Sequence, residues 1–347
     1  MRILQLIESL GRGGAEHALL SGLPALAARG HQVELWALRP PADLLPNFLA
    51  HNIHTKVLEK KWPLLPALAA RFCPDVIHTH LFFANLCGRA AALLYRTPLC
   101  TSLHNPDYSA EGGGRWNLRR SLDRISAGLA PPTFVAVSSG VQADYREQMG
   151  YDSQVVWNPI DPFWLRPGPS RQAARQQLQL SQTERVIFGC GRLHRQKGFD
   201  VLADATTDLP STRVVIAGEG AERAQLAHRL QLIGSQDRNG LRLWLAACDV
   251  VVVPSRYEAF GIFAAEALAA GCALVCSDVP GLRECVGDAA LLVPSEDVVA
   301  LGQVLKKVLT DSALADSLRQ KGPPQAARYT PAAWAERMEQ IYLSLCS

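Results

Sequence analysis

The segment Val250–Glu266 reads VVVVPSRYEAFGIFAAE. Its first four residues form a β-branched run that is typical of a buried strand, and the apolar, Ala-rich residues after Gly261 are typical of a helix. The loop between them contains proline, serine and glycine, which favour turns. A strand joined by a short loop to a helix is the repeating unit of a parallel sheet, so this segment predicts an α/β fold.

The same alternation of β-branched runs and Ala/Leu-rich stretches continues on both sides of this segment. The expected strands are Ile3–Ile7, Gln32–Leu38, Val76–His78, Leu99–Leu103, Phe134–Val137, Val186–Cys190, Arg213–Ala217, Leu232-Ile233, Val250–Val253, Ala273–Cys276 and Ala290–Val293. The expected helices are Ala15–Arg29, Asn85–Leu94, Trp116–Leu129, Phe199–Thr206, Ala221–Leu230, Leu241–Cys248 and Ile262–Ala270. This order predicts two doubly wound, Rossmann-like domains that face a cleft at the carboxyl ends of their strands.

A proline-punctuated connector separates the two series of strands, with WNPIDP at 157–162 and PGP at 167–169. We therefore expect a first domain over residues 1–163 and a second over residues 164–325. Residues 326–347 predict a final helix whose apolar residues, Trp334, Met338, Ile341 and Tyr342, share one face. This helix either crosses back to the first domain or caps the second.

Length and composition limit the class of protein. The 347 residues suffice for two domains, and 48% hydrophobic against 19% charged residues indicates a globular rather than a disordered chain. The formal net charge is only +3, and neither half of the chain has a strong basic excess. We therefore do not expect nucleic-acid binding.

The sequence also predicts the compartment and the state of the cysteines. No apolar run reaches the roughly 18 residues of a membrane span, and Glu8 ends the first apolar run too early for a signal-peptide core, so a cytoplasmic protein is expected. The nine cysteines are odd in number and lack paired CxxC spacing, which favours reduced thiols. The chain has no Asp-x-Asp pair and His78-x-His80 lacks a third ligand nearby in sequence, so no metal site is expected.

Three loops of the second domain, each after an expected strand, carry residues suited to a diphosphate. The first loop contains the two cations Arg192 and Lys197, and the second contains Gly218 and Glu219. The third leads into a helix whose first amides, at Gly261, Ile262 and Phe263, offer N–H groups to an anion. Taken singly, the first loop also fits a solvated basic turn and the second fits ordinary turn chemistry.

Two carboxylates lie in or next to this helix. Glu266 sits on its otherwise apolar surface, where a carboxylate is costly unless a partner satisfies it. Ribose hydroxyls would satisfy it, and so would a buried arginine or a neighbouring helix end. Glu258 precedes the helix and enters the cleft from another direction, so the two carboxylates are expected to contact different parts of one ligand.

The first domain offers fewer candidates. Gly13 and Gly14 follow the first strand and open a helix, but a dinucleotide fingerprint would need glycine where Glu16 stands, and a plain tight turn remains the alternative. His78 is expected to be a structural histidine in a strand. His104, in the loop after the next strand, is the better candidate for a reacting centre.

Together these residues resemble glycosyltransferase family 4, the retaining GT-B enzymes that use nucleotide sugars. The resemblance covers nearly the whole chain and rests on Gly13-Gly14-Ala15-Glu16, Val137-Ser138, Asn158-Pro159-Ile160-Asp161, Gly191-Arg192-Leu193, Gln196-Lys197-Gly198, Gly218-Glu219-Gly220, Pro254-Ser255, the pair Glu258 and Glu266, and Ser277-Asp278-Val279-Pro280-Gly281. Several ordered motifs are far more specific than any one of them.

The resemblance implies a role for each candidate residue. Arg192 and Lys197 would bind the donor diphosphate, together with the backbone of Phe260, Gly261, Ile262 and Phe263. Glu266 would hold the ribose hydroxyls, Glu258 would contact the donor sugar, and Gly218 and Glu219 would contact the donor. In the first domain, His104 would lie beside the transferring carbon, and the loop of Gly13 and Gly14 would lie under the donor phosphate and the acceptor. It further implies front-face transfer with retention, without a metal or other cofactor, in which the two cations stabilise the leaving diphosphate.

We therefore expect a retaining hexosyltransferase that moves a sugar from a UDP- or GDP-sugar to a cell-envelope glycan or lipid-linked acceptor, in polysaccharide or lipopolysaccharide biosynthesis. A nucleotide-sugar epimerase of the same architecture and a non-catalytic sugar-binding protein remain the alternatives. The stretch KKWPLL at 60–65, with Leu68 and Phe72, predicts either contact with the cytoplasmic surface of the inner membrane or a helix whose apolar side faces the core.

Overall fold

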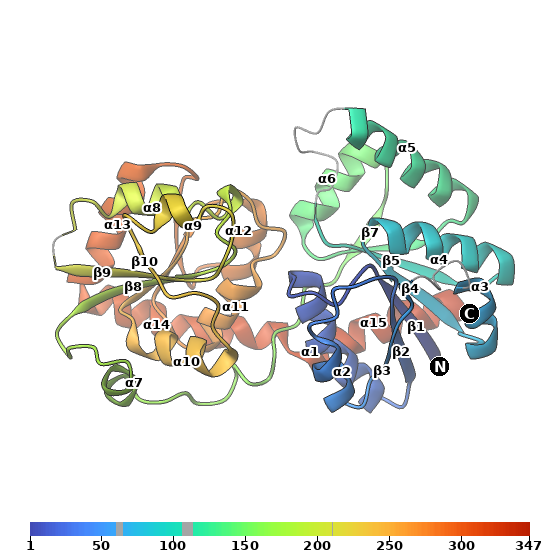
Figure 1. Ribbon diagram of the computed structural model, residues 1–347, viewed down its shortest axis with the longest axis horizontal. Coiled ribbons are helices and arrows are strands. Elements are labelled where there is room, and N and C mark those ends of the chain that lie inside the picture. Colours follow the sequence, from blue (N-terminus) through green and yellow to red (C-terminus); the bar gives the residue numbers. More distant parts are fainter. Residues whose placement is uncertain (60–64, 106–113, 210) are drawn as a thin grey trace. The chain divides into compact units, whose positions relative to one another are not determined.

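Two parallel β-sheets organise the chain (Figure 1). The computed structural model describes residues 1–59, 65–105, 114–209 and 211–347. One unit consists of Met1–Ile160 together with Tyr329–Ser347, and the other consists of Asp161–Arg328. Each sheet lies in one unit, so the two-domain α/β fold expected from the sequence is confirmed.

The first unit contains seven parallel strands among the described residues, in the order β3-β2-β1-β4-β5-β6-β7. They are β1 (Arg2–Ile7), β2 (Gln32–Ala37), β3 (His54–Val57), β4 (Val76–His80), β5 (Leu99–Leu103), β6 (Thr133–Ala136) and β7 (Ser153–Val155). The order reverses between β1 and β4, which is the arrangement of a doubly wound sheet with its ligand edge at the carboxyl ends of the strands.

Helices cover both faces of this sheet (Figure 1). They are α1 (Gly14–Ala28), α2 (Leu45–Ala50), α3 (Leu65–Phe72), α4 (Phe82–Tyr95), α5 (Gly114–Leu129), α6 (Ser139–Met149) and α15 (Pro331–Cys346). Strand β1 shows the division, because Ile3 and Ile7 pack with α1 and α15 while Leu4 and Leu6 pack with α3 and α4. Successive strand residues point to opposite faces, so a strand buried on both sides reads as a continuous apolar run.

The second unit has a six-stranded parallel sheet among the described residues, in the order β10-β9-β8-β11-β12-β13. Its strands are β8 (Arg185–Cys190), β9 (Thr212–Ala217), β10 (Gln231–Leu232), β11 (Val250–Val253), β12 (Leu274–Ser277) and β13 (Leu291–Val293). The order reverses between β8 and β11, where the loop after each strand reaches the same edge of the sheet.

The helices of the second unit are α7 (Arg171–Gln177), α8 (Phe199–Ala205), α9 (Arg223–Leu226), α10 (Arg238–Ala247), α11 (Ile262–Ala269), α12 (Pro280–Val286), α13 (Val298–Thr310) and α14 (Ser312–Ala326), with a 3₁₀ turn at Arg195–Lys197. Helices α8 and α13 pack over Ile187 and Val252 on one face of the sheet. On the other face, the Phe188 ring stacks on Trp244 of α10 and meets Phe263 of α11 edge-on.

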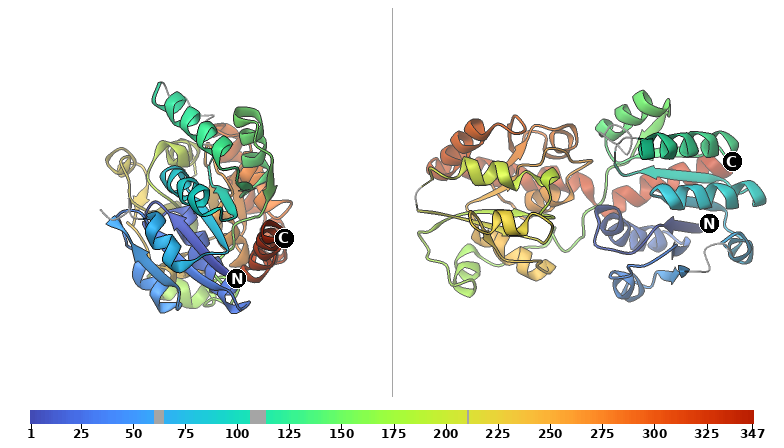
Figure 2. Two further views of the ribbon diagram at one scale, coloured as in Figure 1. Left: turned by 90° about the vertical axis from the view of Figure 1, so that its right-hand side faces the viewer. Right: turned by 45° about the horizontal axis from the view of Figure 1, so that its top comes forward.

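The last helix belongs to the first unit. Trp334, Met338, Ile341 and Tyr342 are buried in its core, and Trp334 packs so closely on α1 that a Cβ added at Gly22 would come within 2.6 Å of its ring. Figure 2 shows α15 in red along the blue and cyan elements of this unit. The sequence left open whether this helix crosses back to the first domain or caps the second. In the structure it returns to the first unit.

The unit boundaries differ by a few residues from those expected. The second unit begins at Asp161 rather than at 164 and ends at Arg328 rather than at 325. Helix α14 runs through Gly322, Pro323 and Pro324 to Ala326. Here Gly322 packs directly against the backbone of Leu268 in α11, which is a tertiary contact that no local pattern encodes.

Several short elements were missing from the sequence-based assignment. Strands β3 and β7 are edge strands, and edge strands tolerate the polar residues that hide a strand pattern. Helix α9 covers only Arg223–Leu226 instead of the expected 221–230. In α3, Leu65 and Phe72 are buried in the core and Leu68 packs against it, whereas the basic part of that stretch, 60–64, lies outside the described residues.

The sequence predicts reduced cysteines and no membrane-spanning segment. All nine cysteines are unpaired, and five of them, Cys100, Cys248, Cys272, Cys276 and Cys285, are buried. Within the described ranges, no helix is both long and apolar enough to cross a membrane.

Candidate functional site

The loops after β8, β9 and β11 are joined to one another at the carboxyl edge of the second unit's sheet. The Arg256 amide donates to the Gln196 carbonyl at 2.8 Å, and the Gln196 side-chain amide donates to the Tyr257 carbonyl at 3.1 Å. The Leu193 amide donates to the Glu219 carbonyl at 2.9 Å. These bonds bring the three motifs, of which the first and third bond to each other across 61 positions, into one surface.

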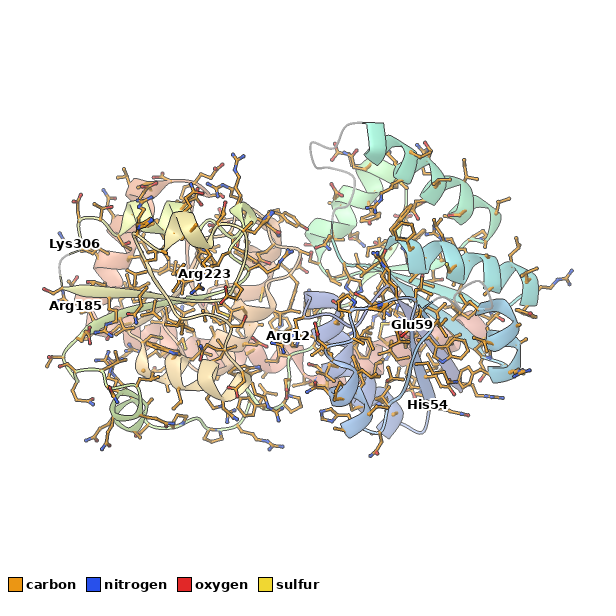
Figure 3. The ribbon with its side chains drawn as sticks, in the orientation of Figure 1. Arg12, His54, Glu59, Arg185, Arg223 and Lys306 are labelled. Atoms are coloured by element: carbon orange, nitrogen blue, oxygen red, sulfur yellow. The ribbon has the colours of Figure 1, made fainter. Side chains whose placement is uncertain are left out.

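Glycine is required where two of these loops cross. Gly218 has φ of +144°, and a Cβ added there would lie 1.9 Å from the Gly191 carbonyl oxygen. Any side chain would therefore force the β8 and β9 loops apart. Glu219, which is expected to contact the donor, pairs with Arg223 of the following helix at 3.1 Å, and both side chains are about half exposed. Figure 3 labels Arg223 in this part of the second unit.

Lys197 and Glu258 form an ion pair within this surface. The Lys197 ammonium donates to Glu258 Oε1, and the Ser255 hydroxyl donates to the same oxygen at 2.9 Å. Both charged side chains are largely buried, with 20% and 12% exposed. Arg192, the second expected cation, is exposed and makes a long 3.4 Å hydrogen bond to Gln196. Lys197 is therefore held in place by protein partners, while Arg192 extends into solvent.

Helix α11 begins at this edge with uncapped amides. Gly261 precedes it with φ of +95°, and no side chain accepts a hydrogen bond at this end. The amides of Ile262 and Phe263 have no acceptor among the described residues. Free amides at a helix N-terminus carry partial positive charge and favour an anion. The Phe260 side chain is buried, so only its backbone is available to a ligand, whereas the Phe263 ring is half-buried and meets Phe188 edge-on.

Glu266 lies one turn further along α11. Burial raises the pKa of its carboxyl to about 8, the nearby Asp161 carboxylate raises it further, and a hydrogen bond with the Trp164 side chain opposes both effects. The expected alternatives for Glu266 were a buried arginine or a helix end, and the structure provides Trp164 instead. Sequence analysis missed this partner, although the adjacent aromatics Phe163-Trp164 beside the Asn158–Asp161 motif were a signal for it.

In the first unit, Gly13 and Gly14 lie at the start of α1, after the loop that follows β1. Gly13 precedes the helix in an extended conformation, and no side chain caps the helix. The buried Glu16 carboxylate packs against Gly13, where an added Cβ would approach Glu16 Oε2 to 2.4 Å, and burial raises its pKa. Arg12 is exposed in this loop, as Figure 3 shows. A side chain at position 13 would therefore require the Glu16 carboxylate to move.

His104 follows β5 and is held by a chain of hydrogen bonds. His104 Nε2 lies 2.9 Å from His80 Nδ1, and His80 Nε2 lies 2.8 Å from the Gln5 side-chain oxygen. The Gln5 amide nitrogen donates to the Tyr342 hydroxyl at 3.1 Å. With the amide in this orientation, His80 donates through Nε2 and therefore accepts through Nδ1, so His104 donates through Nε2. Burial lowers the pKa of His104 to about 4, so its ring is neutral at physiological pH.

This series of hydrogen bonds ends at His78, the histidine that was expected to be structural. The Tyr342 hydroxyl lies 2.6 Å from His78 Nδ1, and His78 Nε2 lies 2.8 Å from the Ser102 hydroxyl. His78 is fully buried, and burial lowers its pKa to about 3. The expectation that His78 is a structural histidine is confirmed. The Tyr342 hydroxyl of α15 joins the hydrogen bonds of His80 and His104 to those of His78 and Ser102. Sequence analysis placed Tyr342 on an apolar helix face and missed this polar role.

No group of three or more His, Cys, Asp or Glu side chains with metal-site geometry occurs in the described part of the chain. The positive groups at the edge of the second unit include Lys197, Arg192 and the α11 N-terminus. This arrangement favours an anion such as a diphosphate.

Both halves of the chain match described families. Residues 12–163 match Glycosyltransferase Family 4, and residues 170–325 match Glycosyl transferases group 1. Among curated relatives, D-inositol 3-phosphate glycosyltransferase of Corynebacterium urealyticum is 30% identical over 78% of this chain and 72% of its own length. The protein of the same name from Jonesia denitrificans is 28% identical over 77% and 71%.

Solved structures share the fold over the whole chain. HepE of Anabaena in complex with UDP has a TM-score of 0.86 at 21% identity, covering 99% of this chain and 100% of that one. Sucrose-phosphate synthase from Thermosynechococcus elongatus has a TM-score of 0.83 at 22% identity, with 99% of each chain covered. WaaG, described as a glycosyltransferase involved in lipopolysaccharide biosynthesis, has a TM-score of 0.76 at 17% identity over 99% of each chain.

Proposed function

Because this chain belongs to the GT4-type glycosyltransferases and has the GT-B fold, we propose that it is a retaining, metal-independent hexosyltransferase with a uridine or guanosine diphosphate sugar as donor. The observation that carries the proposal is the placement of Lys197, Glu258 and the open N-terminus of α11 on one edge of the second unit's sheet. A uridine donor has further support, because HepE is described in complexes with UDP and with UDP-glucose.

In this proposal the diphosphate is bound by charge and by backbone amides. The amides of Ile262 and Phe263 donate to phosphate oxygens, and the Lys197 ammonium moves from Glu258 to the diphosphate. Arg192 adds a second cation from the same loop. As the bond between the sugar and the diphosphate breaks, these groups stabilise the negative charge that develops on the leaving group.

The two carboxyl groups then serve different parts of the donor. Glu266 is largely protonated at neutral pH, so its carboxyl group both donates and accepts hydrogen bonds, which suits the paired hydroxyls of a ribose. Glu258, once Lys197 turns to the phosphate, accepts hydrogen bonds from sugar hydroxyls. The ion pair keeps both side chains ordered before the donor binds.

We assign the acceptor to the first unit, at the loop containing Gly13 and Gly14 and beside His104. A neutral His104 is unable to protonate a leaving group, so its role is to position the reacting sugar through hydrogen bonds. The proposed acceptor is a cell-envelope glycan or a lipid-linked sugar, in lipopolysaccharide or polysaccharide synthesis at the cytoplasmic face of the membrane. The fold shared with WaaG supports this class of acceptor.

A nucleotide-binding series tests the donor assignment. UDP, GDP, ADP and CMP are compared by thermal shift, since a ligand at about 100 times its Kd adds about 2.7 kcal/mol to the free energy of unfolding. We expect UDP to give the largest shift. Lys197→Ala is expected to weaken UDP binding about 10- to 100-fold through the lost charged hydrogen bonds.

Lys306→Ala is the matched control, because Lys306 is an exposed lysine on α13 of the same unit (Figure 3). Its affinity for UDP should equal that of the unchanged protein. Absence of binding to every nucleotide, or unchanged affinity in Lys197→Ala, would contradict the assignment.

A product analysis tests the reaction. With a UDP-hexose and a sugar acceptor, NMR of the product should show the anomeric configuration of the donor, and EDTA should leave the rate unchanged. An inverted anomeric carbon would overturn retention. Epimerised donor formed without acceptor would favour the epimerase alternative.

A further inference from the structure

Helix α5 turns an apolar face to solvent. Leu118, Leu122, Ile125 and Leu129 recur every three or four residues, so they form one stripe along the helix, and they are 62%, 41%, 61% and 66% exposed. The opposite side of the helix carries Asp123, which is buried. An ordinary surface helix has the reverse arrangement, with its apolar face inward.

A buried ion pair fixes the helix in this orientation. The Arg89 guanidinium of α4 donates to the Asp123 carboxylate, to the Asp123 carbonyl at 3.1 Å and to the Ser126 hydroxyl at 2.8 Å. Removing either charge would leave its partner buried and uncompensated. Rotation of α5 to bury its leucines would break this pair, so the outward direction of the stripe is built into the packing of α4 and α5.

The end of α4 adds further exposed apolar side chains, of which Tyr95 lies on the α3 side, beside Ala69 and Cys73. Leu93, Leu94 and Tyr95 are exposed there, and α4 lies alongside α5 (Figure 1). Of the twelve large apolar side chains that are exposed in the described parts of the chain, eight lie on these two helices. Figure 2 shows both helices on the outside of the first unit. We call Leu93, Leu94, Leu118, Leu122, Ile125 and Leu129 the α4–α5 face. A clustered apolar surface of this kind marks an interaction site.

The charges around the α4–α5 face indicate the occupant. Between residues 118 and 129 there are three arginines, Arg119, Arg120 and Arg124, and one acid, Asp123, whose charge Arg89 neutralises. Arg119 lies over the Phe82 and Phe83 rings and Arg120 donates to the Gln148 carbonyl, so Arg124 is the exposed cation of the three. Arg124 is exposed, and Arg96 follows α4 directly. A second copy of the chain packed face to face would bring these arginines together without acidic partners. An anionic surface would be complementary to them.

We propose that the α4–α5 face docks the protein on an anionic lipid bilayer, with its leucines at the boundary between headgroups and acyl chains and its arginines at lipid phosphates. The stripe runs along the helix axis, so α5 would lie parallel to the membrane plane. This docking uses no residue of the sugar-nucleotide site. It would keep the enzyme at a surface where lipid-borne acceptors are concentrated.

Vesicle flotation of the full-length protein tests the proposal. Vesicles of phosphatidylcholine alone are compared with vesicles in which a third of the lipid is phosphatidylglycerol. We expect retention on the anionic vesicles only, a loss of more than about tenfold in Leu122→Asn/Ile125→Asn, and about fivefold weaker binding in Arg124→Gln. All three positions are exposed, so these variants should keep the thermal stability and the UDP-induced shift of the unchanged protein.

Val299→Asn is the matched control, since Val299 is 67% exposed on α13 of the other unit. It should float like the unchanged protein. Equal retention of Leu122→Asn/Ile125→Asn would overturn the proposal. So would a dimer in sedimentation velocity that dissociates in that variant, because a second copy would then be the occupant. If UDP binding fails while vesicle binding persists, the proposed function is wrong and the docking surface stands.

Discussion

Glu266 shows how strongly its surroundings change a single side chain. Its carboxyl group has a pKa of about 8 against an ordinary value near 4.5, because burial and the Asp161 carboxylate both disfavour the charged form. Between these pH values the folded protein keeps a proton that the unfolded chain has lost. The free energy of unfolding therefore falls as pH rises through this window, at most by about 1.4 kcal/mol per pH unit.

Replacing Glu266 with Gln should remove this dependence. We expect Glu266→Gln to be about 1–3 kcal/mol more stable than the unchanged protein at pH 8.5 and nearly equal to it at pH 4.5, in urea unfolding followed by circular dichroism. Glu336→Gln, at an exposed position on α15, is the control and should leave the pH profile unchanged. Parallel profiles for Glu266→Gln and the unchanged protein would show that Glu266 is ionised in the fold.

Gly261 illustrates a backbone constraint at the same helix. Its φ of +95° disfavours any L side chain, and an added Cβ would lie 2.6 Å from a methyl carbon of Leu282. We expect Gly261→Ala to lower the free energy of unfolding by about 1–3 kcal/mol and to weaken UDP binding, because the amides after it would shift.

Gly128→Ala is the control for Gly261→Ala. Gly128 lies within α5, and an added Cβ there would meet no atom within 4 Å. Alanine favours a helix over glycine, so this variant should be equally stable or up to about 1 kcal/mol more stable. A Gly261→Ala protein with unchanged stability and unchanged UDP affinity would show that the loop tolerates a side chain.

Helix α15 contributes a polar link between elements that lie far apart in the sequence. Its Tyr342 hydroxyl joins Gln5 of β1 to His78 of β4, and through Gln5 it reaches His80 and His104. Hydrogen bonds in such a buried chain fix which nitrogen of each imidazole carries the proton. The helix therefore positions His104 without touching it.

Tyr342→Phe tests this link. Removing the hydroxyl leaves buried polar groups on Gln5 and His78 without a partner, which should cost about 1–3 kcal/mol of stability. We also expect the ¹⁵N signals of the His80 and His104 rings to change, because the tautomer is no longer fixed. Met338→Leu, on the same buried face of α15, should cost less than about 1.5 kcal/mol and leave these signals unchanged. Unaltered imidazole signals in Tyr342→Phe would limit Tyr342 to packing.

The chain as a whole enters the second unit once and returns, so the first unit is built from two segments. Its core contains Trp334, Met338, Ile341 and Tyr342 from the last 19 residues, beyond the end of the second unit at Arg328. The second unit is continuous in sequence. Loss of the C-terminal segment should thus affect the two units differently.

A chain that ends at Arg328 should leave the first unit without cooperative structure. In hydrogen exchange, we expect amides of β1 and β4 to lose protection while those of β8 and β11 keep it, and the UDP-induced thermal shift should persist. A chain that ends at Leu343 keeps Tyr342 and serves as the control, with protection retained in both units. Retained protection of β1 and β4 in the shorter chain would show that α15 is dispensable to the first core.

The α/β fold and the loop motifs at the carboxyl ends of the strands are local features, so they could be read from the sequence. Strand Val250–Val253 has its expected bounds and helix Ile262–Ala269 ends one residue before its expected end, because a doubly buried strand and an apolar helix have strong sequence patterns. Edge strands such as β3 carry weak patterns and were missed. The loops at this edge of the second sheet were recognisable because glycine, lysine and glutamate residues follow directly after apolar strands.

The sequence alone determined the succession of strands and helices and the set of charged groups at the carboxyl ends of the strands. Both depend on residues that are close together in the sequence. Folding in three dimensions decided the rest: that Lys197 meets Glu258 across 61 positions, that Trp164 meets Glu266, that Tyr342 reaches the histidines, and that α5 points its leucines outward. Each of these depends on contacts between distant segments, and the burial, charge and hydrogen bonds that shift a pKa or fix a tautomer exist only once those segments pack together.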